Sequence, residues 1–303
     1  MSRIIDEDIQ RILSSPLPWA RLQGKTILIT GAGGMIGGYC ARVADRLSYL
    51  IPLHRDTLYD RLSVRPDFII HAASPASPRA YCADPMGTIR ANTVATESLL
   101  NIGADMLYLS SGEVYGEGAP TPCPETFSGP LDATNPRNVY ASAKRRGESL
   151  CFSRADVNVK IARISHTYGP GMKLDDGRVF ADFVSDIVNK RDIVLKSDGL
   201  ARRPFCYLAD LVLGLFTILL KGERGRAYNV GAEQEVSIAY LAATLSAMYP
   251  TSRVVREART ESDSYIPSGC EGGHLDIAKI RALGWNPTTG IEEGFRRTVA
   301  SYD

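Results

Sequence analysis

The amino-acid sequence predicts an α/β protein in which a doubly wound parallel sheet is followed by a smaller C-terminal region. Two observations carry this prediction. Apolar runs typical of buried strands, at residues 25–30, 67–74, 106–111 and 159–164, alternate with helix-like segments, and such alternation is typical of a parallel sheet with helices on both faces. The first run also opens onto a glycine-rich turn that leads into a helical stretch ending near residue 47.

The pattern divides the chain into three segments. Residues 1–23 are expected to form an N-terminal helical arm, because isoleucines recur there at helical spacing before a turn rich in serine and proline. Residues 24–165 carry the alternating pattern of the main domain, and part of residues 203–230 would complete it through a strand-like run at 226–230. Residues 166–303 are less regular, and we expect them to form mainly the region that covers a substrate.

The composition limits the kinds of partner that the protein can bind. The chain has 303 residues, of which 44% are apolar, so it can bury a sizeable core. Lysine plus arginine (35) nearly balances aspartate plus glutamate (34), which disfavours nucleic acid and anionic membranes as partners and leaves anionic ligands to a few local arginines.

Cysteine usage and hydropathy indicate the compartment. The six cysteines form no CxxC pair and do not cluster with the four histidines, so we expect neither a metal site nor a disulfide framework. The sequence shows no signal-peptide pattern and no run long enough to span a bilayer. These observations predict a cytoplasmic protein without a membrane partner.

The glycine-rich turn indicates a dinucleotide site. Its spacing places glycine where the chain turns tightly, where the backbone approaches a pyrophosphate and where the helix packs on the strand. The start of the following helix then offers free N–H groups and the positive end of its dipole to the phosphates. The residues expected to contact the cofactor here are Gly31, Gly34, Met35, Ile36 and Gly37.

Two residues about 20 positions after the glycine-rich turn bear on whether the cofactor is NAD or NADP. Asp56 would bind the adenosine ribose and favours NAD, whereas Arg55 would suit the 2′-phosphate of NADP. We expect NAD and leave NADP open. The chain between Gly37 and Phe68 has room for one shortened strand and one small helix, so we expect a reduced adenine side of the pocket.

The catalytic pattern is a tyrosine and a lysine four residues apart. Tyr140 and Lys144 would lie on one face of a helix, where the ammonium would lower the pKa of the phenol. Tyr140 would then remove a hydroxyl proton while hydride passes to the nicotinamide. Ser111, at the end of the third apolar run, would complete a triad with these two residues.

With this triad behind a glycine-rich turn, the chain resembles the extended short-chain dehydrogenase/reductases, the NAD-dependent epimerase/dehydratase family, from about Gly24 onward. The motifs at 71–78, 163–170, 176–179 and 201–207 are most similar to the UDP-glucuronate decarboxylase branch of that family. The resemblance implies a Rossmann domain, a retained nicotinamide cofactor and a nucleotide-diphosphate sugar as substrate. It also implies a homodimer joined through a four-helix bundle, to which each subunit would contribute residues 85–102 and 138–153.

The same resemblance implies roles for individual residues. Ser111 would bind the 4-oxygen of the sugar, Glu113 would orient the ring, and Arg203 would meet the diphosphate. Further contacts to the cofactor would come from Ala72, Ala73, Ser74, Asn92, Ser110, Tyr140 and Lys144. Contacts to the substrate would come from Pro75, Ser77, Tyr81, Arg137, His166, Thr167, Arg178, Val179 and Arg203. His71 is expected to be a hydrogen-bonded packing group rather than a base.

The reaction on the sugar is then a choice within one family. Tyr140 would take the 4-hydroxyl proton and create a 4-keto sugar. A 4,6-dehydratase would carry an aspartate where this chain has Gly112, whereas a decarboxylase needs no such acid, because a carboxylate β to a ketone leaves as carbon dioxide. The expected function is therefore closest to a UDP-glucuronate decarboxylase.

Three departures from that branch keep other reactions open. Gly112 replaces a serine, His166 an asparagine, and Gly171 an arginine. A 4-epimerase, a 4-keto reductase or a 4,6-dehydratase of a surface polysaccharide pathway would use the same tyrosine and lysine. A non-catalytic NAD(P)-sensing protein is disfavoured, because both Tyr140 and Lys144 are present.

Overall fold

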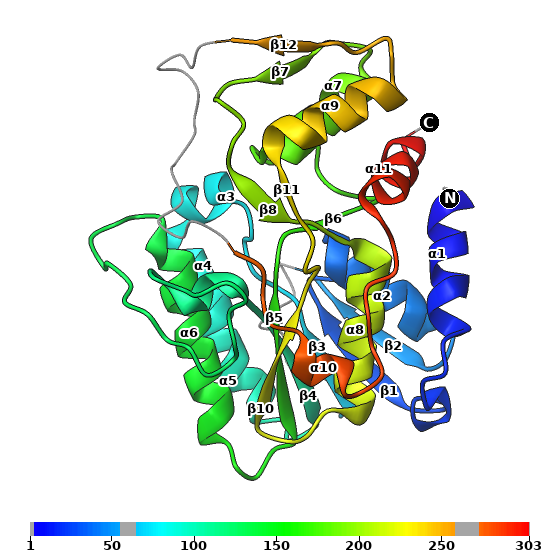
Figure 1. Cartoon of the computed structure of the whole chain (residues 1–303). Helices are drawn as coiled ribbons and strands as arrows, with labels where there is room; N and C mark the ends of the chain where they lie inside the picture. Colours follow the sequence, from blue (N-terminus) through cyan, green and yellow to red (C-terminus); the bar gives the residue numbers. More distant parts are fainter. Residues whose placement is uncertain (1–2, 55–64, 258–272, 303) are drawn as a thin grey trace.

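The structure is a computed structural model that describes residues 3–54, 65–257 and 273–302. Its centre is a six-stranded parallel sheet with the order β2-β1-β3-β4-β5-β10 (Figure 1). The strands are β1 (Thr26–Thr30), β2 (Tyr49–Leu53), β3 (Phe68–His71), β4 (Asp105–Ser111), β5 (Val159–Ile164) and β10 (Arg226–Val230). The predicted α/β class and doubly wound parallel sheet are confirmed.

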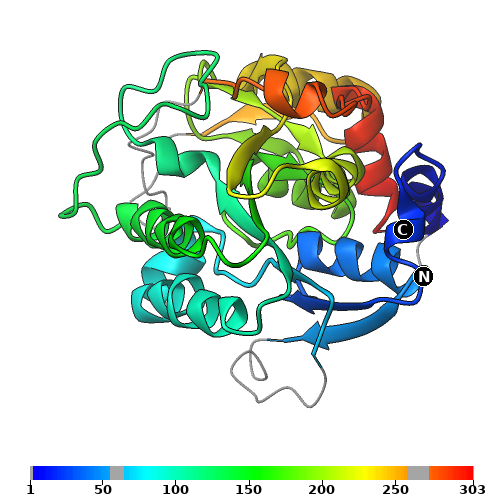
Figure 2. The ribbon, with the colours of Figure 1, turned by 90° about the horizontal axis from the view of Figure 1, so that it is seen from below.

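Helices cover both faces of the sheet. On one face lie α4 (Pro85–Asn92), α5 (Val94–Leu100) and α6 (Asn138–Ser153). On the other lie α2 (Met35–Asp45) and α8 (Leu208–Lys221), as Figure 2 shows from below. Helix α8 is apolar all round and almost entirely buried, because it packs against the sheet on one side and the C-terminal segments on the other.

The order of the strands reverses direction beside β1. The chain places β2 on one side of β1 and β3 on the other, so the carboxyl ends of β1 and β3 diverge. Ligands bind at such a switch point in open α/β sheets. Between the glycine turn and β3 the described residues hold one strand, β2, in line with the expected reduced unit; Arg55 and Asp56 lie outside the described residues.

The smaller region lies beyond the carboxyl edge of the sheet, at the top of Figure 1. Its strands form three pairs: β6 (Thr167–Tyr168) with β9 (Cys206–Tyr207), β7 (Ile193–Leu195) with β12 (Val254–Arg256), and β8 (Arg202–Pro204) with β11 (Glu235–Ser237). Its helices are α7 (Val179–Val188), α9 (Ile238–Met248) and α11 (Ile291–Ala300).

The C-terminal half of the chain does not form one continuous region. Helix α8 and strand β10 return to the main sheet, and the short helix α10 (Ala278–Arg281) packs beside β10. Two further short helices, α3 (Pro78–Ala83) and the 3-10 helix η3 (Gly112–Tyr115), follow β3 and β4. The elements that carry candidate site residues therefore meet at one edge of the sheet.

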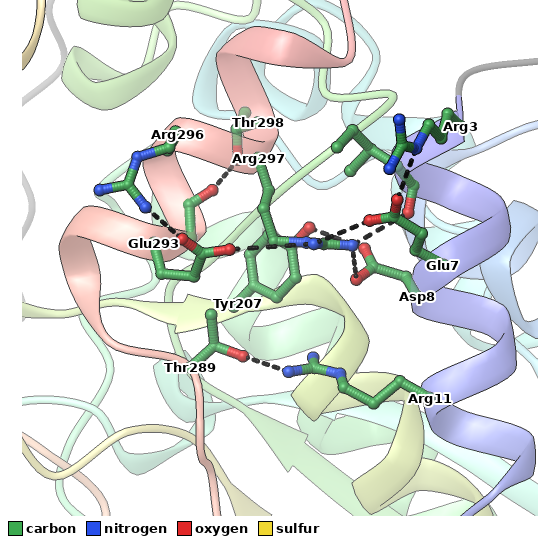
Figure 3. A network of polar contacts seen from close by, with 12 residues as sticks. Arg3, Glu7, Asp8, Arg11, Tyr207, Thr289, Glu293, Arg296, Arg297 and Thr298 are labelled. Atoms are coloured by element: carbon green, nitrogen blue, oxygen red, sulfur yellow. Dashed lines mark hydrogen bonds and ion pairs between the residues drawn. The ribbon is translucent and has the colours of Figure 1, made fainter.

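The N-terminal arm is helix α1 (Arg3–Leu13), followed by the 3-10 helix η1 (Trp19–Arg21). It packs against α2 and α8, and its Ile9 and Ile12 belong to the main core. A buried aspartate, Asp8, ties it to the rest of the molecule. Asp8 accepts hydrogen bonds from Tyr39 (3.1 Å) and Tyr207 (2.7 Å) and forms an ion pair with Arg297 of α11 (3.0 Å), part of the network in Figure 3.

Candidate active site

The glycine turn has the shape that a dinucleotide requires. Gly31 has φ 71°, and a Cβ on it would lie 3.0 Å from the backbone of Ala72 and Ala73 at the end of β3. A Cβ on Gly37 would lie 2.2 Å from the carbonyl oxygen of Gly31, so helix and turn pack as closely as the sequence predicts. Gly34 is the N-cap of α2 and provides no side-chain cap, which leaves the first N–H groups of α2 available to an anion.

A chain of hydrogen bonds fixes the loop after β3. The backbone N–H of Ala73 donates to Thr30 Oγ1 (3.1 Å), Thr30 Oγ1 donates to His71 Nδ1 (2.7 Å), and His71 Nε2 donates to the carbonyl of Ala91 (3.1 Å). Burial, together with the charge of Lys144, lowers the pKa of His71 to about 3. His71 is therefore a neutral packing group, and it holds Ala72, Ala73 and Ser74 beside the glycine turn.

Asn92 forms three hydrogen bonds within the protein. Its side chain is fully buried, donates to Ser74 Oγ (2.9 Å) and to the carbonyl of Thr88 (2.8 Å), and accepts from Tyr108 (3.0 Å). Through the first of these bonds Asn92 supports Ser74. Its expected contact with the cofactor stays a prediction.

The structure brings the three residues of the predicted triad together. Tyr140 and Lys144 lie on successive turns of α6, and the Nζ of Lys144 is 5.8 Å from the centroid of the Tyr140 ring. Ser111, the last residue of β4, is near enough to Tyr140 to lower the pKa of its phenol, and it accepts a hydrogen bond from the backbone N–H of Glu113 (3.2 Å). Lys144 donates to the carbonyl of Leu109 (2.6 Å) and is almost completely buried.

Burial has the largest influence on the pKa values of Tyr140 and Lys144. Burial lowers the pKa of Lys144 to about 7, so its amine is only partly charged at neutral pH. Burial and the carboxylate of Glu113 raise the pKa of Tyr140, although Ser111 and Arg178 act in the opposite direction. The net direction of the Tyr140 pKa is upward because desolvation outweighs the favourable contacts, and the predicted effect of the Lys144 ammonium on the phenol stays a prediction.

Three arginines act on the buried His166. Burial, together with the charges of Arg203, Arg178 and Arg137, lowers the pKa of His166 to about 3. Arg137 and Arg178 also act on Glu113, whose pKa burial nevertheless raises. The three arginines expected to bind substrate therefore all act electrostatically on one buried side chain.

Each arginine comes from a different element. Arg137 is the N-cap of α6. Arg178 is the N-cap of α7, where it pairs with Asp176 (Nε to Oδ2, 2.8 Å) and lies over the Phe180 ring at 4.8 Å. Arg203 lies in β8 and donates to the carbonyl of Arg202 (2.7 Å). The site therefore joins the main domain to the smaller region.

Of the other residues predicted to contact the substrate, some are partly exposed and others form hydrogen bonds within the protein. Val179 begins α7 with 36% of its surface exposed, and Pro75 is half-buried in the loop before α3. Ser77 caps α3 by accepting from Ala80 N (3.3 Å), and Thr167 is buried and donates to the carbonyl of Ser165 (3.1 Å). The hydroxyl of Thr167 thus has a partner within the protein, and its expected contact with the substrate stays a prediction.

Tyr81 is fully buried against Tyr140. Its ring stacks on Tyr140 with centroids 5.1 Å apart and an interplanar angle of 10°. Its hydroxyl has no hydrogen-bond partner among the described residues. Tyr81 therefore packs Tyr140 in place.

Two orphaned hydroxyls show that the site suits a dinucleotide. Ser110 Oγ and Ser165 Oγ are buried without a partner in the described part of the chain, at the carboxyl ends of β4 and β5. Buried polar groups are normally hydrogen-bonded. Together with the glycine turn and the uncapped start of α2, they fit a nicotinamide dinucleotide that Gly31, Gly34, Met35, Ile36 and Gly37 would hold by its pyrophosphate.

Ser165 was missed by the sequence reasoning. Its signal was positional: it directly follows a buried strand of the parallel sheet, where ligand contacts concentrate. A Cβ on Gly231, which follows β10, would lie 2.2 Å from Ser165 Oγ, so the two strand ends are closely packed. Within residues 3–54, 65–257 and 273–302 there is no cluster of histidine, cysteine and acidic side chains that would hold a metal ion.

No helix in the same ranges is both long and apolar enough to cross a membrane.

The fold and the site define a class of protein, the dinucleotide-dependent enzymes with a Ser-Tyr-Lys triad. Comparison with known proteins narrows this class. Residues 49–231 match the model of the NAD dependent epimerase/dehydratase family, more than half of the chain. The chain therefore belongs to the NAD dependent epimerase/dehydratase family.

Curated relatives and solved structures agree with this assignment. The chain is 30% identical over 314 residues to UDP-glucuronic acid decarboxylase 1 of Xenopus tropicalis, covering 91% of this chain and 71% of the relative. It is 30% identical over 300 residues to UDP-glucuronic acid decarboxylase 6 of Arabidopsis thaliana, with coverages of 88% and 86%. The UDP-glucose 4-epimerase of Thermotoga maritima, solved with UDP-glucose, shares the fold with a TM-score of 0.78 at 22% identity, covering 91% of this chain and 98% of that one.

Proposed function

We propose that the protein is a nucleotide-sugar decarboxylase that oxidises C4 of a nucleoside-diphosphate uronate, UDP-glucuronate in the first instance, and releases its carboxylate as carbon dioxide. The observation that carries this proposal is that the charges of Arg137, Arg178 and Arg203 all act on His166, and that the charge of Arg178 acts on Tyr140 as well. Three guanidinium groups match the charge of a diphosphate and one additional carboxylate. In a chain of net charge +1, such a concentration of cations is a local feature rather than a general one.

Ser111 and Tyr140 have separate roles from the cofactor in this reaction. Ser111 and Tyr140 lie together, so both reach one sugar hydroxyl, and Tyr140 takes the 4-hydroxyl proton. NAD, when bound, accepts the C4 hydride and later returns it. The carboxylate is then β to a ketone, so the bond between C5 and the carboxyl carbon breaks and the electron pair passes into an enolate that is reprotonated at C5.

Gly112 separates this reaction from dehydration. A 4,6-dehydratase needs an acid beside Glu113 to protonate the departing 6-hydroxyl, and glycine offers none. A Cβ at Gly112 would face the Leu275 side chain at 3.5 Å, an apolar neighbour. Decarboxylation needs no proton donor at that position. The names of the curated relatives support the same choice.

The direct test is to incubate the protein with UDP-glucuronate and NAD and to analyse nucleotide-sugars by mass spectrometry and NMR. We expect a UDP-pentose and an equal amount of carbon dioxide, with no net NADH. UDP-galacturonate would instead show 4-epimerisation, and stoichiometric NADH or NADPH turnover would show an oxidase or reductase. Either result, or no reaction with UDP-, GDP- and dTDP-linked uronates, rejects decarboxylation.

The proposal includes a homodimer formed through α4, α5 and α6. Met86, Val94 and Phe152 are large apolar residues on these helices that are 58%, 49% and 47% exposed, and exposed apolar groups of this kind mark interaction surfaces. Leu99 and Leu100 of α5 are buried in the core and are not part of this surface. Analytical ultracentrifugation of the wild type should give twice the monomer mass. The variant Phe152→Glu should give the mass of a single monomer.

The cytoplasm is the compartment we propose. Five cysteines, Cys40, Cys82, Cys123, Cys151 and Cys206, are free thiols in the described part of the chain. Unpaired cysteines are typical of a reducing compartment. Fractionation of the source cells would test this placement.

A further inference from the structure

Helix α6 carries a third buried ionisable side chain beyond the catalytic pair. Tyr140, Lys144 and Glu148 follow one another at intervals of four residues, so they lie along one face of the helix. Lys144 is 3% exposed and Glu148 is 5% exposed. Acidic residues are almost never this buried without a specific partner.

Apart from Glu148, none of the described groups that act on Lys144 brings a negative charge to its ammonium. Its Nζ donates to the neutral carbonyl of Leu109 and lies 5.0 Å from the centroid of the Tyr108 ring. His71, which faces it from β3, is neutral. Cys151, the next residue along the helix face, is a thiol whose pKa burial raises to about 12. Of the described groups that favour the charged form of Lys144, Glu148 acts most strongly.

The carboxylate of Glu148 is itself fixed from β5. Arg163 binds both of its oxygens, with Nε to Oε1 at 3.0 Å and Nη2 to Oε2 at 2.7 Å. The Nη1 of the same guanidinium donates to the hydroxyl of Tyr115 (3.1 Å) and to the carbonyl of Glu125 (2.8 Å). Tyr115 ends η3, the short helix that follows Ser111. The ion pair therefore connects the catalytic helix to the loop that carries Ser111 and Glu113.

We infer that Glu148 is a positioning residue for the reaction: it holds the charge on the buried ammonium of Lys144, while Arg163 fixes the carboxylate in place. Lys144 reaches the substrate only through Tyr140 and the cofactor, and Glu148 acts only through Lys144. The inference rests on the proposed role of Tyr140 and Lys144, but not on which sugar is bound.

The physical consequence is a specific effect on titration. Burial lowers the pKa of Lys144, and the negative charge of Glu148 opposes this effect. Without the Glu148 carboxylate, the ammonium would therefore lose its proton at lower pH. Exchanging Arg163 for lysine keeps a cation beside Glu148 but removes the bidentate fork and the contacts to Tyr115 and Glu125. A merely structural ion pair would make both changes equivalent.

The experiment is an NMR titration of the full chain labelled with ¹³C at the lysine side chains, with the Lys144 signal assigned from Lys144→Met. We expect a midpoint near pH 7 in the wild type. Glu148→Gln should lower it by about one pH unit, whereas Arg163→Lys should leave it within a few tenths. In the active enzyme, the alkaline limb of kcat should move down by the same amount in Glu148→Gln alone.

Two controls keep the outcome decisive. If Glu148→Gln does not fold because it leaves Arg163 unpaired, the double variant E148Q with R163Q removes both charges and should lower the midpoint in the same direction but by less, because the repulsion from Arg163 is removed as well. An unchanged midpoint, or equal shifts in Glu148→Gln and Arg163→Lys, overturns the inference. Because the titration needs no substrate, a shifted midpoint in a protein that releases no carbon dioxide would refute the proposed reaction and leave this inference standing.

Discussion

Two buried ionisable residues in this protein, Asp8 and Lys144, have different sets of partners. Asp8 in the N-terminal arm accepts from two tyrosine hydroxyls and pairs with the Arg297 guanidinium (Figure 3). Lys144 in the catalytic helix has one carbonyl partner and two aromatic rings near its ammonium. Both residues are almost fully buried, so the difference lies in their partners rather than in their depth.

The partners indicate what each charge does. The groups around Asp8 come from α2, β9 and α11, so the carboxylate joins the cofactor-binding half to the smaller region and serves the fold. Lys144 is left able to titrate near neutral pH, a property common at catalytic sites. The same neighbourhood holds the unpartnered hydroxyls of Ser110 and Tyr81. The contrast between Asp8 and Lys144 leads to specific expectations for variants at both sites.

Tyr140→Phe should have the largest effect. It removes the group that takes the sugar proton but keeps the ring stacked on Tyr81, so turnover should fall about 1,000-fold or more. Affinity for the nucleotide-sugar should stay within about tenfold, or about 1.4 kcal/mol. Steady-state kinetics and calorimetric titration measure the two quantities separately. A variant that retains turnover would remove Tyr140 from the mechanism.

Asp8→Ala tests the structural side of the comparison. Removing one partner of a buried ion pair leaves Arg297 and two tyrosine hydroxyls with unmet bonds, which should lower the free energy of unfolding by about 3 kcal/mol. Urea unfolding at neutral pH measures it. Glu7→Gln is the matched control, since Glu7 also contacts Arg297 but is exposed, and its effect should be far smaller. Equal losses in both variants would show that Asp8 has no special role.

These two sites also show what the sequence could and could not predict. The glycine turn, the strand runs and the spacing of Tyr140 and Lys144 are local patterns, and local patterns follow from the periodicity of helix and strand. The partners of Asp8 lie up to 289 residues away, so no local pattern could name them. The partner of Asn92 on another element, Ser74, is likewise outside any local helical pattern, whereas Thr167 donates to Ser165 only two residues away.

Electrostatics was the least predictable part of the site. The expected effect of Lys144 on the Tyr140 phenol was based on helix geometry, which the structure has. The direction of the pKa shift is set by burial and by Glu113, and these depend on how the two layers pack. The resemblance of the arginine motifs to a known branch, by contrast, led to three residues whose charges all act on His166.

The neighbouring residues Arg202 and Arg203 sharpen the distinction between a binding and a surface arginine. They point to opposite sides of β8: Arg202 donates to the carbonyl of Glu235, whereas the charge of Arg203 acts on His166. Arg203→Ala should raise KM for the nucleotide-sugar about 10- to 100-fold, because it removes a charge-assisted bond to the ligand. Arg202→Ala should change KM less than about threefold. The same KM increase in both would place the diphosphate elsewhere.

Lys144→Met should have the smallest effect on stability and the opposite sign from Asp8→Ala. The folded pKa of Lys144, about 7, is below its ordinary value of 10.5, so burying the charged form costs stability. That cost is fully present below pH 7 and is relieved as the pH rises toward 10.5, because in this window the unfolded chain binds the additional proton. The inactive methionine variant should therefore be more stable than the wild type by about 1 kcal/mol at neutral pH.

The advantage of Lys144→Met should shrink steadily between pH 7 and pH 10.5, which urea unfolding at several pH values would follow. Glu148 keeps Arg163 as its partner in this variant, so no buried carboxylate is left unpaired to obscure the gain. A methionine variant less stable than the wild type at every pH would mean that the Lys144 ammonium holds the fold together as Asp8 does. The contrast between a charge kept for structure and a charge kept for chemistry would then fail.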